Sequence, residues 1–594
     1  MEDKHKPKDK KAAFTRLVDY LKPHKGSLAV GIISNVGLGL VGLIPPLIYG
    51  KITDQVVRSD SALDSSRTGL LLLCAVWLLA VYAALAFLMF ARSCVMHVLG
   101  EKIILELRKQ VYSRLQMLSV SYFDSSRTGE IMSRVTNDTE VVEEFVNHAA
   151  DTLISDVIRL IAMCVVMFVI SPVLAFVALV PVPILFFLAF RFARRIRRIY
   201  RAVRERLAEI NAKVQENVSG IRVIKAFARE DYEFENFRRE ADNYYETRVS
   251  AVRMWTRFFP SVEMLIRTGQ IAIWVVGPIL IIRGGASMGT LVIFMLYLQM
   301  LYQPVGGLAR ISDTIQRSLA AAERIFEIVD EPQQIKDADD AVEIPRIQGR
   351  VEFDHVDFSY EDGEDVLMDI CIKVEPGQIV ALVGRSGAGK TSIVNLIPRF
   401  YDPDKGRVLI DGFDVKHVTQ HSLRRQVAMV LQDNFLFNAT VRENIRYGKL
   451  DATDDEVVEA AKAANAHEFI EQMPSGYDTE IGERGIKLSG GQQQRMAIAR
   501  AIIADPRILI LDEATSSVDS ESEYLIHRAM DRLMEGRTTF VIAHRLSTVK
   551  HADQIITLDH GRVSEIGDHR SLLDRDGTYS QMYEMQFRLN EELS

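Results

Sequence analysis

The stretch Ile379-Val-Ala-Leu-Val-Gly-Arg-Ser-Gly-Ala-Gly-Lys-Thr391 decides how the C-terminal half of this chain folds. The aliphatic run 379–383 predicts a buried strand, and Gly384 to Thr391 fits the pattern G-x-x-x-x-G-K-[ST]. Glycines let the backbone curl so that its N–H groups face phosphate oxygens, and the following helix adds its positive N-terminus. We therefore expect an α/β domain that holds a nucleotide, with Lys390 bridging the β- and γ-phosphates and Thr391 giving a hydroxyl to Mg²⁺.

A second aliphatic run, Ile508-Leu-Ile-Leu, ends in the carboxylates Asp512 and Glu513. A solvated loop is the ordinary setting of an Asp-Glu pair, but such a loop rarely follows four consecutive aliphatic residues. We interpret 508–512 as another buried strand of the same sheet. Asp512 is the expected Mg²⁺ ligand, and Glu513 is the expected general base for an attacking water.

The N-terminal half is dominated by long stretches without charge, at 26–50, 68–91, 160–190 and 284–309. A bilayer core of about 30 Å needs roughly 20 helical residues, so the chain contains a membrane region. Ser171-Pro172 divides the third stretch into two spans as a tight hairpin. With a further span that begins near Glu263 and Arg267, we expect six spans, at about 26–50, 69–91, 152–170, 172–191, 262–282 and 287–308.

Positive charge near the spans predicts the orientation. Seven arginines between Arg191 and Arg204 follow the fourth span, and several lysines precede the first. By the positive-inside tendency, the N-terminus and the domain after the sixth span lie in the cytosol. Residues 12–22 carry a one-sided apolar stripe, which predicts a short interfacial helix, with a flexible tail as the alternative.

Composition excludes several other classes of protein. The net charge of −8 gives no electrostatic case for nucleic-acid binding. The four cysteines are scattered without metal-ligand spacing, so neither a disulfide framework nor a zinc site is expected, and we interpret them as small buried hydrophobes: Cys74, Cys94, Cys164 and Cys371.

The segment Leu488-Ser489-Gly490-Gly491-Gln492, together with the motifs above, resembles the ABC transporters. This resemblance implies a multidomain fold: an all-α six-helix transmembrane domain followed by an α/β P-loop ATPase, the ABC nucleotide-binding domain. It implies that His544 orients the γ-phosphate, that Asp519 belongs to a dimer-contact loop, and that Thr391, Gln432 and Asp512 serve Mg²⁺. It implies an ATP site made of Tyr360, Gly384, Arg385, Ser386, Gly387, Ala388, Gly389, Lys390, Thr391, Ser392 and Gln432.

The resemblance covers almost the whole chain. In particular, the chain is similar to exporters of the lipid A flippase and P-glycoprotein type. This resemblance implies a transmembrane domain at 1–319 and an ATPase domain at 346–594, with coupling segments at 121–130 and 220–230. The acidic residues and prolines between them predict a linker at 320–345. In this family Leu488 to Gln492 caps the nucleotide held by a partner subunit, so a second half-transporter is needed. A homodimer is expected because Glu513 and the signature segment are both intact, and a heterodimer is the alternative.

The cargo is less well specified by the sequence. Largely apolar spans with aromatic residues favour a hydrophobic or amphipathic cargo, such as a drug or lipid. The resemblance implies ATP-driven export of this cargo, or its flipping from the inner to the outer leaflet, across the cytoplasmic membrane of a bacterium. Glu263 and Arg267 are candidate substrate contacts, because charges within a membrane often serve function, and a salt bridge in a helix extension is the alternative. A dedicated exporter of peptides or thiol conjugates, and an ATP-gated regulator without cargo, are the other hypotheses.

Overall fold

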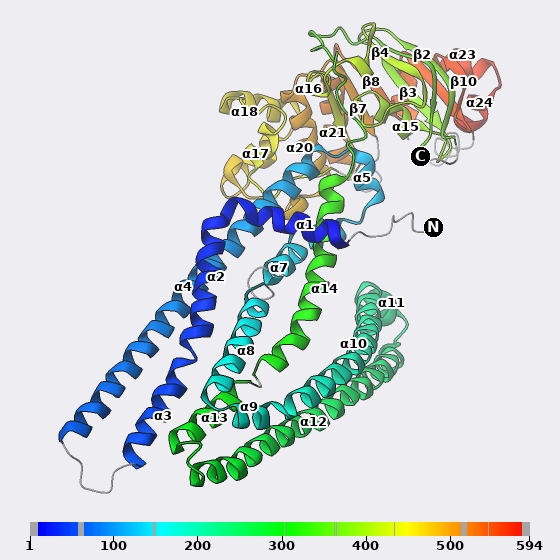
Figure 1. Cartoon of the computed structure of the whole chain (residues 1–594). Helices are drawn as coiled ribbons and strands as arrows, with labels where there is room; N and C mark the ends of the chain where they lie inside the picture. The colour runs from blue at the N-terminus through cyan, green and yellow to red at the C-terminus, as the bar shows by residue number, and fades with distance from the viewer. Residues whose placement is uncertain are drawn as a thin grey trace. The chain divides into compact units, whose positions relative to one another are not determined.

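The structure is a computed structural model that describes residues 10–57, 65–145, 150–301, 303–360, 363, 365–432, 434–512, 519–543 and 546–584. The chain divides into two compact units (Figure 1). The first comprises Met1–Gln116 and Thr128–Glu331, and the second comprises Met117–Arg127 and Pro332–Ser594. The short segment Met117–Arg127 therefore belongs with the C-terminal half, although it lies between helices of the N-terminal half in sequence.

The described part of the first unit is helical throughout. Four segments are long and apolar enough to cross a membrane, namely Ala13–Val57, Thr68–Met117, Pro172–Ser219 and Glu230–Ile282, and two shorter apolar helices lie at Val157–Ile170 and Met288–Leu301. Each of the six expected spans overlaps one of these segments. The helices are α1 (Lys10–Leu21), α2 (Lys25–Val41), α3 (Ile44–Val57), α4 (Ser65–Met117), α6 (Thr128–Val135), α7 (Asn137–Glu144), α8 (Ala150–Ile170), α9 (Pro172–Leu179), α10 (Pro181–Ser219), α11 (Ile221–Ala226), α12 (Glu230–Ile282), α13 (Met288–Leu301) and α14 (Gln303–Asp330), with a 3₁₀ turn at Lys22–His24.

Prolines decide where the apolar helices break. The first expected span is interrupted between α2 and α3, because Pro45 and Pro46 have no backbone N–H to continue a helix and instead occupy the first turn of α3. The hairpin expected at Ser171-Pro172 coincides with the junction of α8 and α9, where Ser171 has an extended backbone. A further break at Val180-Pro181 separates α9 from α10.

Two of the longest helices, α10 and α12, run side by side (Figure 1) and pack closely along their length. Phe192 on α10 stacks on Phe258 of α12 with ring centroids 3.9 Å apart, and Trp255 lies edge-on to Phe192. Another long helix, α14, continues to Asp330 because Ala321, Ile325 and their neighbours are buried along one face. The expected linker at 320–345 therefore differs from the structure, in which only its part after Asp330 lies outside a helix.

The second unit contains two sheets. A six-stranded sheet has the order β10-β9-β3-β8-β7-β6, with parallel pairing from β9 through β6, and a four-stranded antiparallel sheet has the order β2-β1-β4-β5. Their strands are β1 (Val351–Phe358), β2 (Leu367–Val374), β3 (Ile379–Gly384), β4 (Lys405–Ile410), β5 (Phe413–Asp414), β6 (Val427–Val430), β7 (Ile508–Asp512), β8 (Thr538–Ile542), β9 (Gln554–Asp559) and β10 (Arg562–Gly567).

Short helices surround these sheets and include two that begin at predicted motifs, α15 and α20. They are α5 (Val120–Ser125), α15 (Lys390–Leu396), α16 (Gln420–Arg424), α17 (Val441–Arg446), α18 (Asp454–Ala463), α19 (His467–Glu471), α20 (Gly490–Ile503), α21 (Ser520–Met534), α22 (Leu546–His551), α23 (His569–Asp574) and α24 (Thr578–Tyr583), with 3₁₀ turns at Val415–His417, Gly476–Asp478 and Glu483–Gly485.

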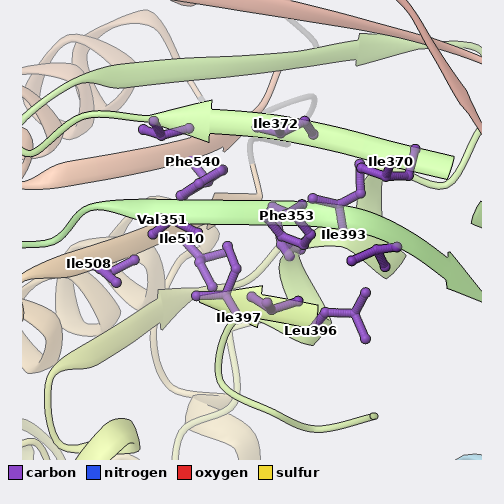
Figure 2. Packing of buried hydrophobic residues seen from close by; sticks show 14 of the residues in the cluster. Val351, Phe353, Ile370, Ile372, Ile393, Leu396, Ile397, Ile508, Ile510 and Phe540 are labelled. Atoms are coloured by element: carbon purple, nitrogen blue, oxygen red, sulfur yellow. The ribbon is translucent and has the colours of Figure 1, made fainter. Parts of the chain in front are cut away.

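The core between the two sheets fixes the helix that follows the phosphate loop. Figure 2 shows Phe353 and Ile370 of the antiparallel sheet, Ile510 and Phe540 of the parallel sheet and Ile393 of α15 gathered in one apolar cluster. All of these side chains are almost completely buried. Burial of apolar surface stabilises such a cluster by roughly 25 cal/mol per Å², so the position of α15 beneath the loop is firmly determined.

The cysteines correct one expectation. Cys74 and Cys164 are half-buried, and Cys94 and Cys371 are exposed, so none is a fully buried small hydrophobe. Cys371 lies on β2, where residues alternate between the core and the outer face, and its two neighbours Ile370 and Ile372 take the buried positions. The apolar letters around Cys371 therefore indicated a strand and not the burial of the cysteine itself.

Candidate nucleotide site

A cavity of about 880 Å³ lies in the second unit at the carboxyl ends of the parallel strands. Its volume suits a ligand of nucleotide size. Every residue of the expected ATP site and the expected Mg²⁺ ligand Asp512 border it, together with three that the sequence did not indicate, Val366, Ile542 and Met582. The predicted lining residues are Tyr360, Gly384, Arg385, Ser386, Gly387, Ala388, Gly389, Lys390, Thr391, Ser392, Gln432 and Asp512.

The phosphate loop owes its shape to glycine. Gly387 and Gly389 have φ values of +80° and +98°, which side chains with a Cβ rarely adopt, and Gly389 caps α15. A Cβ on Gly389 would lie 2.5 Å from Cδ2 of Leu367, so the loop also packs too tightly for one. The backbone N–H groups at the start of α15 are thereby left facing the cavity as an anion cradle.

Lys390 is buried beneath this loop. Its Nζ donates to the carbonyl oxygens of Gly384 at 2.7 Å and Arg385 at 3.0 Å. Burial lowers the pKa of Lys390, and the nearby Asp512 carboxylate opposes that shift. A positive charge held by two neutral carbonyls beside one carboxylate is well placed to receive phosphate oxygens.

Tyr360 lies just beyond the end of β1, at the rim of the cavity. Its hydroxyl is 2.9 Å from that of Ser392, and its ring is packed edge-on by Phe358 and Tyr401, with centroids 4.8 Å and 5.1 Å away. The side chain nevertheless stays 43% exposed. The ring is thus held in a fixed position with surface left for a flat ligand to stack on.

The sheet order brings the other predicted residues to the same edge. β8 lies between β3 and β7 and pairs in parallel with both, so all three strands end beside the cavity. Asp512 is the last residue of β7, and Gln432 follows β6 as an exposed residue. Glu513 comes directly after β7 and His544 two residues after β8, and both lie outside the described residues.

The signature segment begins another helix. Ser489 caps α20: its hydroxyl accepts from the N–H of Gln492 at 3.3 Å, and the Gln492 side chain accepts from the N–H of Ser489 at 3.0 Å. Leu488 and Gly491 are buried, whereas Ser489 and Gly490 are exposed. None of Leu488 to Gln492 lines the nucleotide cavity. The motif is therefore a capping box whose exposed residues are not part of the cavity around this chain's own phosphate loop.

Asp519 has a local structural role. Its carboxylate accepts from the N–H of Ser522 at 2.9 Å as the cap of α21, and this hydrogen bond lowers the pKa of Asp519.

Among the predicted substrate contacts, Arg267 pairs with Glu263 on the same face of α12 at 2.8 Å, and both are exposed. Neither lines the cavity of the first unit that is described next.

A different cavity, of about 480 Å³, lies among the helices of the first unit. Arg159 on α8 borders it, and its Nε is buried without a hydrogen-bond partner among the described residues. The guanidinium lies beside Gly42, where a Cβ would be in ordinary van der Waals contact with one of its nitrogens at 3.5 Å. The remaining lining is mixed polar and apolar: Asn35, Leu38, Gly39, Pro45, Pro46, Tyr49, Tyr82, Leu85, Met89, Arg92, Leu296, Gln299 and Met300.

Within the second unit, hydrogen bonds connect Met117–Arg127 to the rest of the ATPase fold beside the nucleotide cavity. The Tyr401 hydroxyl donates to the carboxylate of Asp124, and Ser119 donates to the side chain of Gln334 at 3.3 Å. Burial and the Asp124 carboxylate raise the pKa of Tyr401, so its hydroxyl stays protonated. Because Tyr401 also packs on Tyr360, one aromatic ring joins this segment to the edge of the cavity.

The fold and the site together define a class of protein: a helical membrane region followed by a P-loop nucleotide-binding domain. The family model described as ABC transporter transmembrane region matches residues 28–305, and the one described as ABC transporter matches residues 367–516. The second match falls within the second unit, and the first match falls within the first unit except for Met117–Arg127.

Individual relatives are similar over nearly the whole chain. The ATP-dependent lipid A-core flippase of Syntrophus aciditrophicus is 38% identical over 97% of this chain and 94% of its own length. The Bacillus subtilis protein YgaD, described provisionally as a multidrug export ATP-binding/permease protein, is 37% identical over 96% and 99%. A solved bacterial Atm1-family ABC exporter with ATP bound has a TM-score of 0.75 and 31% identity, covering 94% and 98%. The chain belongs to the ABC transporter family, as an exporter-type half-transporter that binds ATP.

Proposed function

We propose that two copies of this chain form a homodimer that hydrolyses ATP with Mg²⁺ and exports or flips a hydrophobic or amphipathic substrate. The observation that carries the proposal is the separation of the phosphate loop from the signature segment. Leu488 to Gln492 do not line the cavity that contains Lys390, although both are part of the family's ATP site. A second subunit in two-fold symmetry supplies the missing half of each site.

Several residues of this chain support the ATPase chemistry. The glycine cradle and the buried Lys390 suit the phosphates, and the exposed ring of Tyr360 suits adenine. Oxygen donors from Thr391, Gln432 and Asp512 all border the cavity and form a donor set that fits Mg²⁺. When bound, Mg²⁺ would neutralise charge on the phosphate oxygens. Glu513 is proposed to take the proton of the attacking water and His544 to stabilise the γ-phosphate.

The contact of Tyr401 with Asp124 supports the coupling of ATP to the membrane helices. Met117–Arg127 includes most of the expected first coupling segment and follows directly from α4, which is long and apolar enough to span the membrane. A movement of the ATPase fold therefore acts on α4 through this segment. The arginines of α10, exposed from Arg191 to Arg204, support an orientation with the ATPase in the cytosol at the cytoplasmic membrane.

The cavity in the first unit supports an amphipathic substrate with an acidic group. Arg159 and Arg92 give it positive charge, while Leu38, Met89 and Leu296 give it apolar surface. A guanidinium nitrogen buried without a partner is costly, and an anionic ligand relieves that cost. We place the substrate here and not at Glu263 and Arg267, because those two side chains neutralise each other.

The ATPase proposal is tested with the full-length protein in lipid nanodiscs. We expect Glu513→Gln to lower the turnover rate at least about 100-fold while ATP binding remains, as for loss of a general base. Unchanged turnover would exclude Glu513 as the base. Stimulation of the wild type by acidic lipids or acidic amphipathic drugs is expected, whereas stimulation by peptides alone would favour a peptide exporter. ATP-dependent accumulation in sealed vesicles excludes the regulator without cargo.

The substrate site is tested with Arg159→Ala and a matched control, Arg267→Ala, which removes an arginine that does not line the cavity. We expect Arg159→Ala to raise the concentration of an acidic amphiphile needed for half-maximal stimulation by about tenfold, because a charged hydrogen bond is lost. Arg159→Lys should recover part of the effect. Equal behaviour of Arg159→Ala and Arg267→Ala would place the substrate elsewhere.

A further inference from the structure

Three potential metal ligands converge on the outer face of the four-stranded sheet. His355 comes from β1, and Asp369 and Cys371 come from β2. Nδ1 of His355 lies 2.6 Å from Oδ1 of Asp369 and 3.4 Å from Sγ of Cys371. All three donor atoms lie within 4.8 Å of one another. None of the three borders the nucleotide cavity, so the cluster is separate from the ATP site.

Two β-bulges create this convergence. The register between β1 and β2 shifts between the pairs Phe353–Ile372 and Val356–Ile370, which leaves two residues of β1 opposite Cys371 alone. It shifts again before the pair Phe358–Leu367, this time with the additional residue on β2. His355 and Asp369 are the residues with positive φ at these shifts, +51° and +52°. A regular ladder would not place all three side chains together.

The spacing of the donor atoms is close to that around a tetrahedral ion. Bonds of about 2.0 Å to nitrogen and oxygen and about 2.3 Å to sulfur hold ligand atoms roughly 3.3 to 3.6 Å apart. The nitrogen–sulfur separation of 3.4 Å falls within this range, and the nitrogen–oxygen separation of 2.6 Å requires a small outward rotation of exposed side chains. The bulges thus preorganise three of four tetrahedral positions, and water can occupy the fourth.

We propose that His355, Asp369 and Cys371 form a binding site for a thiophilic divalent cation, with Zn²⁺ as the best fit. One nitrogen, one oxygen and one sulfur donor match the ligands that zinc accepts, whereas Mg²⁺ and Ca²⁺ take oxygen donors. Asp354 adds negative charge next to His355, although its carboxylate also pairs with Arg407 at 2.9 Å. Because all three donors are exposed, the site exchanges its ion with solution and does not replace a structural zinc centre.

The bound ion would join two strands that lead to the ATP site. β1 ends at Phe358, two residues before Tyr360, and β2 begins with Leu367, which packs against Gly389 of the phosphate loop. Occupation would fix the register of the β1–β2 pair at both bulges. We therefore expect the ion to raise the thermal stability of the ATPase domain, and this expectation is independent of the transported substrate.

Co²⁺ serves as a spectroscopic probe on the reduced, full-length protein in nanodiscs without nucleotide. One equivalent should produce a near-ultraviolet thiolate-to-cobalt band that Zn²⁺ displaces. The band should be absent in Cys371→Ser and present in Cys94→Ser, which removes the other exposed cysteine. His355→Asn and Asp369→Asn should each weaken binding at least about tenfold, and Asn tolerates positive φ, so both bulges persist.

Each variant must bind ATP like the wild type, which shows that the sheet is intact. Absence of the band in the wild type would overturn the proposal. A band that survives Cys371→Ser would come from another cysteine and would also overturn the proposal. A band that survives both His355→Asn and Asp369→Asn at full affinity would show that the Cys371 thiol binds Co²⁺ without these two ligands, which would also overturn the proposal. An increase in melting temperature on addition of Zn²⁺, seen in the wild type and absent in Cys371→Ser, is the second expected result.

Discussion

Two glycine-containing segments are proposed to act on the nucleotide, but different physical features account for their glycines. In the phosphate loop, Gly387 and Gly389 have backbone angles that favour glycine, and a Cβ on Gly389 would collide with Leu367. In the signature segment, Gly490 has no positive φ, and a Cβ there would meet nothing within 4 Å. The first segment is shaped by contacts inside this chain, whereas nothing in the described part of the chain requires a glycine at 490.

This difference indicates where the requirement at Gly490 originates. An exposed glycine at the first turn of a helix costs stability relative to alanine, and it leaves the backbone N–H groups open to close approach. Such a residue is useful when a phosphate from another molecule comes within hydrogen-bond distance. The two segments therefore support a composite ATP site, in which one half is rigid by itself and the other half acquires its function from a partner.

Gly389→Ala is expected to have the largest effect. The substitution places a Cβ 2.5 Å from Cδ2 of Leu367 in a residue with φ of +98°, which costs about 1–3 kcal/mol of backbone strain and distorts the anion cradle. We expect ATP affinity to fall at least about 100-fold, because several N–H groups and Lys390 lose their alignment together. Fluorescent-nucleotide binding and a thermal melt would measure both effects. Normal ATP binding by Gly389→Ala would show that the loop is not limited by its own geometry.

Gly490→Ala is expected to separate folding from catalysis. Because a Cβ there meets nothing within 4 Å, the melting temperature should stay the same or rise slightly, and binding of ATP to the separate subunit should be unchanged. Turnover should fall at least about tenfold, since a methyl group prevents close approach of the partner's γ-phosphate. A variant with full turnover would remove the main argument for a composite site.

A mixture of two impaired variants tests the same comparison in the dimer. Lys390→Ala disables the phosphate loop and leaves the signature segment intact, and Gly490→Ala does the reverse. If the signature acts on the partner's nucleotide, random mixing yields mixed dimers with one complete site and roughly a quarter of wild-type turnover. If the signature acts on its own chain's nucleotide, mixing gives no recovery. Coexpression with two different affinity tags allows the mixed dimer to be isolated and measured.

The parts of the site that could be predicted are those encoded by neighbouring residues. A strand, a glycine loop and a helix follow one another from Ile379 to Leu396, so their geometry is local and their motif is readable. Asp512 could be predicted for the same reason, as the end of an aliphatic run. The fold class followed from the contrast between uncharged spans and an α/β half, and the two family matches confirm it.

Other features depend on pairing between distant segments, which a single sequence does not state. Met582 reaches the nucleotide cavity only because α24 lies beside the parallel sheet, and no local pattern marks it. Arg159 lies within the expected third span, 152–170, but the cavity that it borders results from the packing of five helices. The His355, Asp369 and Cys371 cluster was missed because a register shift between two strands, and not residue spacing, brings these side chains together.

Substitution of Ser489 is expected to have the smallest effect in the signature segment, and it distinguishes two possible roles of the Ser489 hydroxyl. Its hydroxyl caps α20 within this chain, unlike Gly490, so Ser489→Ala should lower stability by about 1 kcal/mol as well as turnover. Ser489→Thr keeps a capping oxygen and should restore the melting temperature. If turnover is restored along with stability, the hydroxyl acts by positioning the N-terminus of α20. If turnover stays low in a stable Ser489→Thr variant, the added methyl group obstructs the partner's nucleotide, which places Ser489 beside Gly490 on the surface that the second subunit completes.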